Sequence, residues 1–192
     1  MKIMKKSFSF VCCLFLAVSC FASCAFAKLP EDGEKIYLTP MSQPEFMLIP
    51  ESTLTITDYE YMTHVNEISD GTKTIADKTM KSAALWVAHK VSDDIYVLQY
   101  HCGFLGSLIL GASVSPSAMA LDEDVASGQV NVWSMHGEEN QQWKFEYYRY
   151  NYYRIRNVAT GRYLTYDPKG VVAWDFVDES SSIFRDQLWC KH

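Results

Sequence analysis

Two copies of one short tryptophan motif constrain this chain more than any other feature of its sequence. Asn140-Gln141-Gln142-Trp143 and Asp186-Gln187-Leu188-Trp189 share the order polar residue, glutamine, any residue, tryptophan, and their tryptophans stand 46 residues apart. Trp86 lies 57 residues before Trp143 and is interpreted as a third copy, in which Ala84 replaces the glutamine. Such a repeat predicts three units, over about residues 35–86, 87–143 and 144–192.

The segments that lead into the two clear copies correspond as well. Tyr96-Val97-Leu98-Gln99 precedes a Gly-Ser-Leu-Ile turn at residues 106–109, and a Val-Asn-Val-Trp run follows at 130–133. In the later copy, the opening and a Thr-Gly-Arg-Tyr-Leu turn fall within residues 155–164, and a Val-Val-Ala-Trp run follows at 171–174. A unit of this size cannot bury its apolar face alone, so the units are expected to pack around a shared core.

Short apolar and aromatic runs between turn residues indicate strands rather than helices. The chain has twelve tyrosines and ten phenylalanines, which suit a pleated sheet better than a helix. Many short strands with regular turns predict an all-β barrel or sandwich. We expect a loop at residues 66–74, a strand, turn and strand across 145–153, and strands at 53–57, 95–100, 108–110, 130–133, 152–155, 163–166 and 171–174.

Residues 1–27 are interpreted as a secretory signal peptide. A basic start with three lysines precedes an apolar run over residues 8–21 and a small-x-small site at Ala25-Phe26-Ala27. The run is shorter than the roughly 20 residues of a membrane-spanning helix, so no membrane span is expected. Cleavage after the leader predicts a secreted or periplasmic domain of residues 28–192, whereas cleavage before Cys20 would leave a lipid-anchored one.

Charge and cysteine content narrow the partners. Residues 28–192 carry 14 basic and 23 acidic side chains, a net charge of about −9, which disfavours nucleic acid and anionic membranes. Only Cys102 and Cys190 follow the leader, too few for a disulfide framework or a cysteine-only zinc site. A Cys102–Cys190 disulfide would close a loop of 88 residues, worth roughly 4–5 kcal/mol, but spacing alone does not show that the thiols meet.

The Gln-x-Trp repeats and the Thr-Gly-x-Tyr-Leu turn resemble those of ricin B-type lectin domains. The resemblance covers residues 93–192, and it extends to 35–86 only through the unit length and Trp86. It implies an all-β β-trefoil of three repeats, in which three four-stranded units close a six-stranded barrel capped by three hairpins. The domain would follow the signal peptide and occupy residues 28–192.

The motif also has a physical reason that does not depend on a ligand. A buried tryptophan at the end of each unit, here Trp143 and Trp189, supplies a large part of the core, roughly 150–250 Å² for each aromatic side chain. A buried glutamine beside it must be hydrogen-bonded, and this holds the neighbouring loop. We therefore expect Gln141 and Gln187 to have a structural role whether or not they also contact a ligand.

In ricin-type lectins a sugar is held by an aspartate after the Gly-x-x-Leu turn, an aromatic platform, and the polar pair ahead of the tryptophan. A sugar offers a C–H face that stacks on an indole, and hydroxyls that a carboxylate or amide can bind. Carried over to this sequence, the candidate carbohydrate-binding residues are Asn131, Trp133, Asn140, Gln141, Trp174, Asp186 and Gln187. The aspartate position is expected to fall on Leu110 in the second unit and Thr165 in the third, which argues against galactose as the ligand.

Several features keep an alternative interpretation. Trp133 and Trp174 are either exposed stacking platforms or hairpin side chains packed against their own units. The aromatic residues of 145–153 form either a ligand surface or strands with aromatics on both faces. The acidic stretches 122–124 and 175–179 are expected to be solvated loops rather than Ca²⁺ sites, because neither has an EF-hand pattern.

The sequence gives little support for catalysis, a metal site or a cofactor. The five histidines lack His-x-x-x-His spacing, and there is no Gly-x-Ser-x-Gly elbow. His101 and Cys102 would point to opposite faces of a strand, so no catalytic dyad is expected. We expect a secreted protein that binds a carbohydrate or glycoprotein. The alternatives are a protein-interaction module, such as a binding subunit of a multi-subunit toxin or a secreted inhibitor with a host partner, and, less favoured, a hydrolase.

Overall fold

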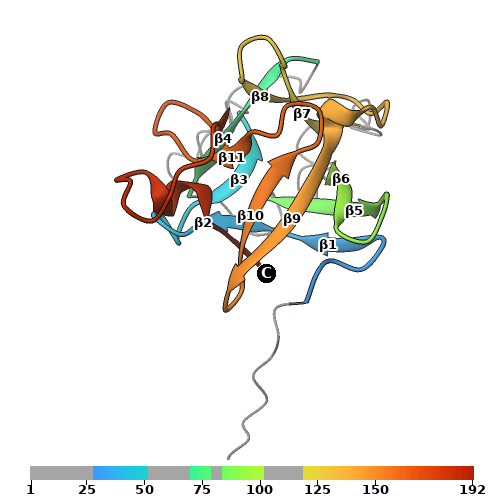
Figure 1. Cartoon of the computed structure of the whole chain (residues 1–192). Helices are drawn as coiled ribbons and strands as arrows, with labels where there is room; N and C mark the ends of the chain where they lie inside the picture. Colours follow the sequence, from blue (N-terminus) through green and yellow to red (C-terminus); the bar gives the residue numbers. More distant parts are fainter. Residues whose placement is uncertain (1–27, 52–69, 79–83, 102–118) are drawn as a thin grey trace, which may run out of the picture.

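The computed structural model describes residues 28–51, 70–78, 84–101 and 119–192. Several expectations therefore lie outside the described residues: the signal peptide and Cys20, the strands at 53–57 and 108–110, Leu110, and Cys102. Within the described ranges the regular elements are β-strands and two short 3₁₀ helices (Figure 1). No helix of these ranges is long and apolar enough to cross a membrane.

The strands follow one another in three sets. The first set is β1 (Glu34–Ile36), β2 (Leu38–Pro40), β3 (Met47–Pro50), β4 (Thr72–Asp77) and β5 (Leu85–Lys90). The second is β6 (Ile95–His101), β7 (Met119–Glu123), β8 (Val130–Ser134) and β9 (Gln142–Arg149), with the 3₁₀ helix η2 (Glu139–Gln141) before β9. The third is β10 (Tyr152–Asn157), β11 (Tyr163–Thr165), β12 (Val172–Trp174) and β13 (Trp189–Lys191), with η3 (Phe184–Gln187) before β13.

Most of the expected elements are found. The expected strands at 95–100, 130–133, 152–155, 163–166 and 171–174 correspond to β6, β8, β10, β11 and β12 within two residues at each end. The strand, turn and strand across 145–153 are confirmed as β9, a turn and β10. The loop expected at 66–74 is wrong at its end, because β4 begins at Thr72 and pairs there with Val132 of β8.

Antiparallel pairings close six strand positions into a barrel. Strand β5 pairs with β6, β6 with β9, β9 with β10, β10 with β13, and β13 with β2. Strand β1, which runs directly ahead of β2, pairs with β5 and so completes the ring (Figure 1). The six barrel positions are therefore paired on both sides, and β3 and β12 of the hairpins are the terminal strands of the described sheet.

Three hairpins, β3–β4, β7–β8 and β11–β12, cap one end of this barrel. Each hairpin contacts the other two. Strand β4 pairs with β8, Gln129 bridges to Val172, and the Val171 amide donates to the Thr74 carbonyl oxygen at 2.8 Å. A six-stranded barrel with three mutually packed hairpins is a β-trefoil, and the expected fold is confirmed.

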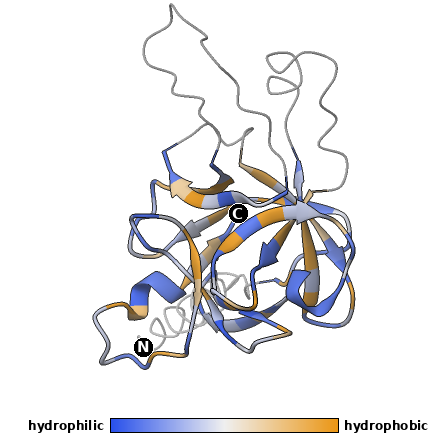
Figure 2. Cartoon of the chain, turned by 90° about the horizontal axis from the view of Figure 1, so that it is seen from above, coloured by the Kyte–Doolittle hydropathy of each residue, from blue (hydrophilic) through white to orange (hydrophobic). Residues whose placement is uncertain are grey.

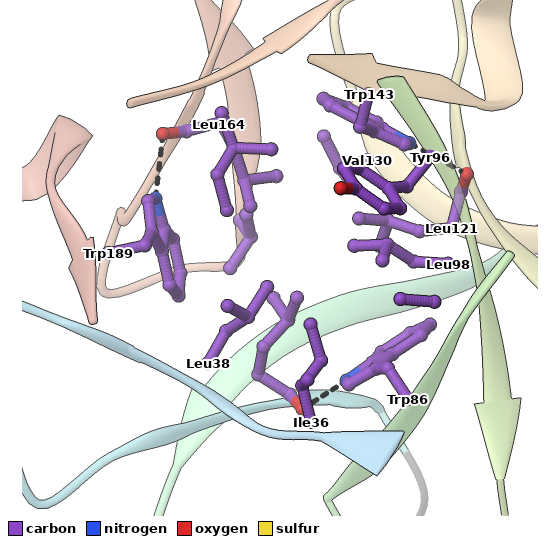
Figure 3. Packing of buried hydrophobic residues seen from close by; sticks show 14 of the residues in the cluster. Ile36, Leu38, Trp86, Tyr96, Leu98, Leu121, Val130, Trp143, Leu164 and Trp189 are labelled. Atoms are coloured by element: carbon purple, nitrogen blue, oxygen red, sulfur yellow. Dashed lines mark hydrogen bonds between the residues drawn. The ribbon is translucent and has the colours of Figure 1, made fainter. Parts of the chain in front are cut away.

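Three tryptophans occupy equivalent places in the core, one from each set of strands (Figure 3). The indole nitrogens of Trp86, Trp143 and Trp189 donate to the carbonyl oxygens of Leu48, Leu121 and Leu164, at 2.9, 3.0 and 2.8 Å respectively. All six side chains are fully buried. The indole of Trp86 therefore serves the first unit as the other two serve theirs, although Ala84 has replaced the glutamine; the exact unit boundaries stay a prediction.

Burial alternates along β9 and β10 and so separates core from surface. Hydrophobic and hydrophilic segments likewise alternate along the ribbon in Figure 2. Phe145 and Tyr153 point into the core, where their rings meet edge to face at 5.7 Å between centroids. Tyr147 and Tyr150 lie near the β9–β10 turn and are mostly exposed. The aromatic run thus contributes to both core and surface.

Candidate functional site

Hairpin register identifies the equivalent site positions in the three units. We take as reference the leucine whose carbonyl oxygen accepts the tryptophan hydrogen bond. The first site position is the residue that follows this leucine. The second is the residue paired with the first across the hairpin, and the third lies two residues after the second. These three positions are Ile49, Ile75 and Asp77 in the first unit, Asp122, Asn131 and Trp133 in the second, and Thr165, Val172 and Trp174 in the third. Carboxylate, amide and indole occur together only in the second unit.

The expectation that Leu110 takes the aspartate position is therefore wrong, and Asp122 takes it. In the third unit, five residues separate β10 from β11, whereas 17 residues separate β6 from β7. Counting forward from the unit's opening motif thus placed the position 12 residues too early. The signal that could have found it is the tripeptide Ala-Leu-Asp at 120–122, which stands before the Val-Asn-Val-Trp run.

Asp122 lies in β7 with 5% of its surface exposed. Its Oδ2 accepts a hydrogen bond from Asn140 Nδ2 at 2.9 Å and lies 3.6 Å from Nε2 of His136. Burial raises the pKa of the Asp122 carboxyl, while the neighbouring side-chain amides and the charge of His136 act in the opposite direction. The carboxylate is thus held in a fixed orientation by its amide neighbour.

A hollow of about 420 Å³ opens beside this carboxylate. Its lining residues come from β7, β8 and the segment before β9: Asp122, Glu123, Asp124, Val125, Asn131, Trp133, His136 and Asn140. Trp133 is 42% exposed, so the interpretation of this side chain as an accessible platform is consistent with its position. Three of the four candidates in the second unit, Asn131, Trp133 and Asn140, come together here with Asp122.

Gln141 is fully buried and is not among the residues that line the hollow. Its Oε1 accepts the backbone N–H groups of His136 and Gly137 at 2.8 and 3.0 Å, and its Nε2 donates to the Ser134 carbonyl oxygen at 3.0 Å. Gly137 has φ +76°, a left-handed conformation that favours glycine. The side chain therefore fixes the segment that carries His136 into the site.

Asp70 and Gly71 of the first unit lie beside the end of β8, which carries Trp133. Oδ1 of Asp70 accepts hydrogen bonds from the Ser134 amide at 2.5 Å and the Ser134 hydroxyl at 2.8 Å, and the Gly71 amide donates to the Val132 carbonyl oxygen at 2.9 Å. A Cβ atom added at Gly71 would lie 3.6 Å from Cζ3 of Trp133. No pattern in the sequence links these positions, because the contact joins neighbouring hairpins.

The third unit keeps the platform but not the carboxylate. Trp174 is 55% exposed. Thr165 takes the aspartate position, as expected, and its hydroxyl donates to the Tyr163 carbonyl oxygen and accepts from Gln187 Nε2. Buried Gln187 also bonds Asp175 and Val177, so its role is structural. The half-buried Asp186 accepts a hydrogen bond from Tyr166 through its backbone oxygen.

The acidic stretch 122–124 is not the solvated loop that we expected, because Asp122 and Glu123 are buried in β7. Glu123 forms an ion pair with Arg162 at 2.5 Å and accepts the Thr160 hydroxyl at 2.8 Å. Burial raises the pKa of the Glu123 carboxyl, although Thr160 and Arg162 act in the opposite direction. Among the described residues, no group of three or more acidic, histidine or cysteine side chains is arranged to hold a metal ion.

Cys190 is half-buried and has no disulfide partner among the described residues, and burial raises the pKa of its thiol. Its expected partner Cys102 lies outside them, so the disulfide stays a prediction.

Comparison with known proteins agrees with this geometry. The family described as ricin-type beta-trefoil lectin domain-like matches residues 111–175, a stretch that includes every residue lining the Asp122 hollow. No curated protein matches the sequence.

Solved structures share the fold at low identity. The designed threefold-symmetric protein ThreeFoil is 20% identical with a TM-score of 0.57, over 83% of this chain and 98% of its own. A Polyporus squamosus lectin, bound to the epitope Neu5Acα2-6Galβ1-4GlcNAc, is 14% identical with a TM-score of 0.56, over 84% of this chain and 49% of its own. A mosquitocidal holotoxin is 14% identical with a TM-score of 0.58, over 85% of this chain but only 17% of its own.

The present chain thus corresponds to about half of the Polyporus lectin and to a small part of the holotoxin. The same fold is indicated by the closed barrel, the three tryptophan hydrogen bonds, the structural neighbours and the family match at 111–175. The chain therefore folds as a β-trefoil, and its residues 111–175 are similar to the family described as ricin-type beta-trefoil lectin domain-like.

Proposed function

We propose that this protein is a secreted lectin-like protein that binds a carbohydrate, without catalysis, in the hollow of its second unit. The observation that carries the proposal is the buried carboxylate of Asp122, oriented by Asn140 at 2.9 Å beside the exposed indole of Trp133. A carboxylate that is fixed next to an aromatic surface suits a sugar, which has hydroxyl groups on its edge and an apolar C–H face.

Each residue has a distinct part in this mechanism. The C–H face of the sugar stacks on Trp133, and two neighbouring hydroxyls donate to the Asp122 carboxylate. Hydrogen bonds to a charged group contribute about 1.5–3 kcal/mol, so the carboxylate is the strongest polar contact of the site. Asn140 positions Asp122 and is itself within reach of the ligand, because it lines the same hollow. A single shallow site of this kind binds weakly, and clustered ligands would raise the avidity.

The structural neighbours support a binding role but include other contexts. Besides the Polyporus lectin, they include a GlcNAcα1-4Gal-releasing endo-β-galactosidase from Clostridium perfringens, 12% identical with a TM-score of 0.54, of which the match covers 31%. The match to a part of this enzyme, or to a part of the holotoxin, is a precedent for the fold alone. The ligand or partner of the present domain must therefore be identified by experiment.

Glycan-array binding of the purified protein tests the proposal, with Trp133→Ala and Trp174→Ala as a matched pair. Both indoles are exposed at equivalent hairpin positions, but only Trp133 has the carboxylate beside it. We expect binding to be lost in Trp133→Ala and retained in Trp174→Ala, with both variants folded by circular dichroism. No binding by the parent protein, or equal loss in both variants, would contradict a lectin site at Asp122.

A second candidate function is a protein-interaction module, such as a binding subunit of a toxin or an inhibitor with a host partner. The observation that favours it is another hollow, of about 310 Å³, where the more than half-exposed Tyr147 and Phe176 stand beside Asp178 and Glu179. Pull-down from a host-cell surface with the parent protein and Phe176→Ala distinguishes the two candidates. A partner that is lost in Phe176→Ala but kept in Trp133→Ala would favour the interaction module.

A further inference from the structure

Carboxylate and amide oxygens line the Asp122 hollow, and the following inference rests on the proposed carbohydrate site. Asp122 and Asp124 offer carboxylate oxygens, and Asn131 offers Oδ1. The side-chain amide of Asn140 is already engaged with Asp122 and also lies 3.5 Å from the Glu123 carbonyl oxygen. A ligand that complements this set must therefore supply hydrogen-bond donors.

Asn131 gives an independent indication of the same kind. Its side chain is 8% exposed, lines the hollow, and faces Asp122 across the β7–β8 hairpin. Its Oδ1 is buried and has no hydrogen-bond partner among the described residues. A buried acceptor without a donor costs about 1–3 kcal/mol, and a ligand hydroxyl or amine bound beside Asp122 would supply the missing donor.

The carboxylates of Asp122, Glu123 and Asp124 are the acidic groups that line the hollow. Asp122 is buried, and its ion-pair partner is His136 at 3.6 Å. Asp124 is exposed at the rim, and hydrogen bonds, led by that from Ser127, lower the pKa of its carboxyl. Glu123 contributes little to this field, because Arg162 pairs with it. Among the lining residues, His136 alone can become cationic.

We propose that this hollow selects neutral sugars and amino sugars and rejects sugars that carry a carboxylate or sulfate. An acidic sugar would place a negative charge beside Asp122 and Asp124, and it would replace a donor with an acceptor next to Asn131. An amino sugar has the opposite effect, because its ammonium group donates to the same oxygens and carries the complementary charge.

Titration with matched monosaccharides tests this selectivity. The probes are the hexose, the 2-amino-2-deoxyhexose and the hexuronic acid of the gluco, galacto and manno series, each measured by calorimetry or ligand-observed NMR at neutral pH and low salt. In any series that binds, we expect the amino sugar to bind at least as tightly as the hexose, and the uronic acid at least tenfold more weakly. Salt should narrow this ratio by screening the charges.

The matched variants are Asp124→Asn and Asp167→Asn. Asp124 follows β7 and Asp167 follows β11, so the two exposed carboxylates occupy equivalent turns, but only Asp124 lines the hollow. Asp124→Asn should reduce the hexose-to-uronate ratio at least twofold, and Asp167→Asn should leave it unchanged.

The outcomes separate the two proposals. A uronic acid that binds within threefold of its hexose would overturn the charge selectivity but leave the carbohydrate site standing. Lack of binding by all nine sugars to the folded protein would overturn both. A ratio that falls equally in Asp124→Asn and Asp167→Asn would show that overall charge, rather than this hollow, sets the preference.

Discussion

Replacing Gln141 by alanine separates a structural role from a ligand-binding one. The side chain makes three hydrogen bonds, to the amides of His136 and Gly137 and to the carbonyl oxygen of Ser134. Each net hydrogen bond is worth about 1 kcal/mol, and an unsatisfied buried group costs about 1–3 kcal/mol. The variant should therefore lose about 3 kcal/mol of unfolding free energy.

Urea denaturation followed by tryptophan fluorescence measures this loss directly. Gln142→Ala is the control, because its neighbouring, half-buried side chain makes one hydrogen bond, to the Gly137 carbonyl oxygen at 2.8 Å, and should cost about 1 kcal/mol. A loss below about 1 kcal/mol in Gln141→Ala, together with abolished sugar binding, would refute the structural assignment and return Gln141 to the ligand site.

Three further predictions follow from the same geometry. Burial raises the pKa of Asp122 above its ordinary value, so sugar binding should weaken as the pH falls through that pKa. Calorimetry from pH 7 to 4 should find that the loss of binding starts at a higher pH than an ordinary aspartate would give. The effect on protein stability has the opposite sign, because a raised pKa means that the folded state favours the neutral carboxyl. Protonation of Asp122 alone should therefore raise the free energy of unfolding at acidic pH, and urea titrations of the parent protein and Asp122→Asn in parallel measure this contribution. Trp86→Phe removes the donor to the buried Leu48 carbonyl oxygen and should cost about 1–3 kcal/mol in urea unfolding; no change would argue against the equivalence of the three tryptophans. The double change Thr165→Asp with Val172→Asn rebuilds the carboxylate and amide beside Trp174, and the calorimetric stoichiometry should rise from one sugar to two if these groups suffice.

The fold could be predicted because the tryptophan repeat reports on the core itself. Trp143 and Trp189 each end a unit by donating to a leucine carbonyl oxygen, and their spacing fixes the unit length. A comparable but longer interval, of 57 residues, led to Trp86, although the glutamine of that copy is lost. Because the core contacts recur in each unit, comparing the units of this one sequence with each other is enough to find them.

The site was predicted less completely, because it depends on features that do not recur. Asn131, Trp133 and Asn140 were found from local patterns, but Asp122 was missed because the interval before β7 is longer than the interval before β11. The support from Asp70 and Gly71 had no local pattern, since it crosses from one hairpin to the next. Register, rather than sequence distance, defines positions that face each other in a sheet.

The closure of the barrel has a consequence for the time course of folding. Strand β2 pairs with β13, and Lys191 Nζ contacts Glu34 Oε1 at 2.9 Å across 157 residues of sequence. The ring therefore stays open during synthesis until residues 189–191 are available, whatever hairpins have already formed. Contacts this distant in sequence slow folding because the chain must lose loop entropy before they form. During that interval the nascent chain exposes strand edges that the finished barrel covers, so pairing of β13 is the step that removes these edges as sites of misassociation.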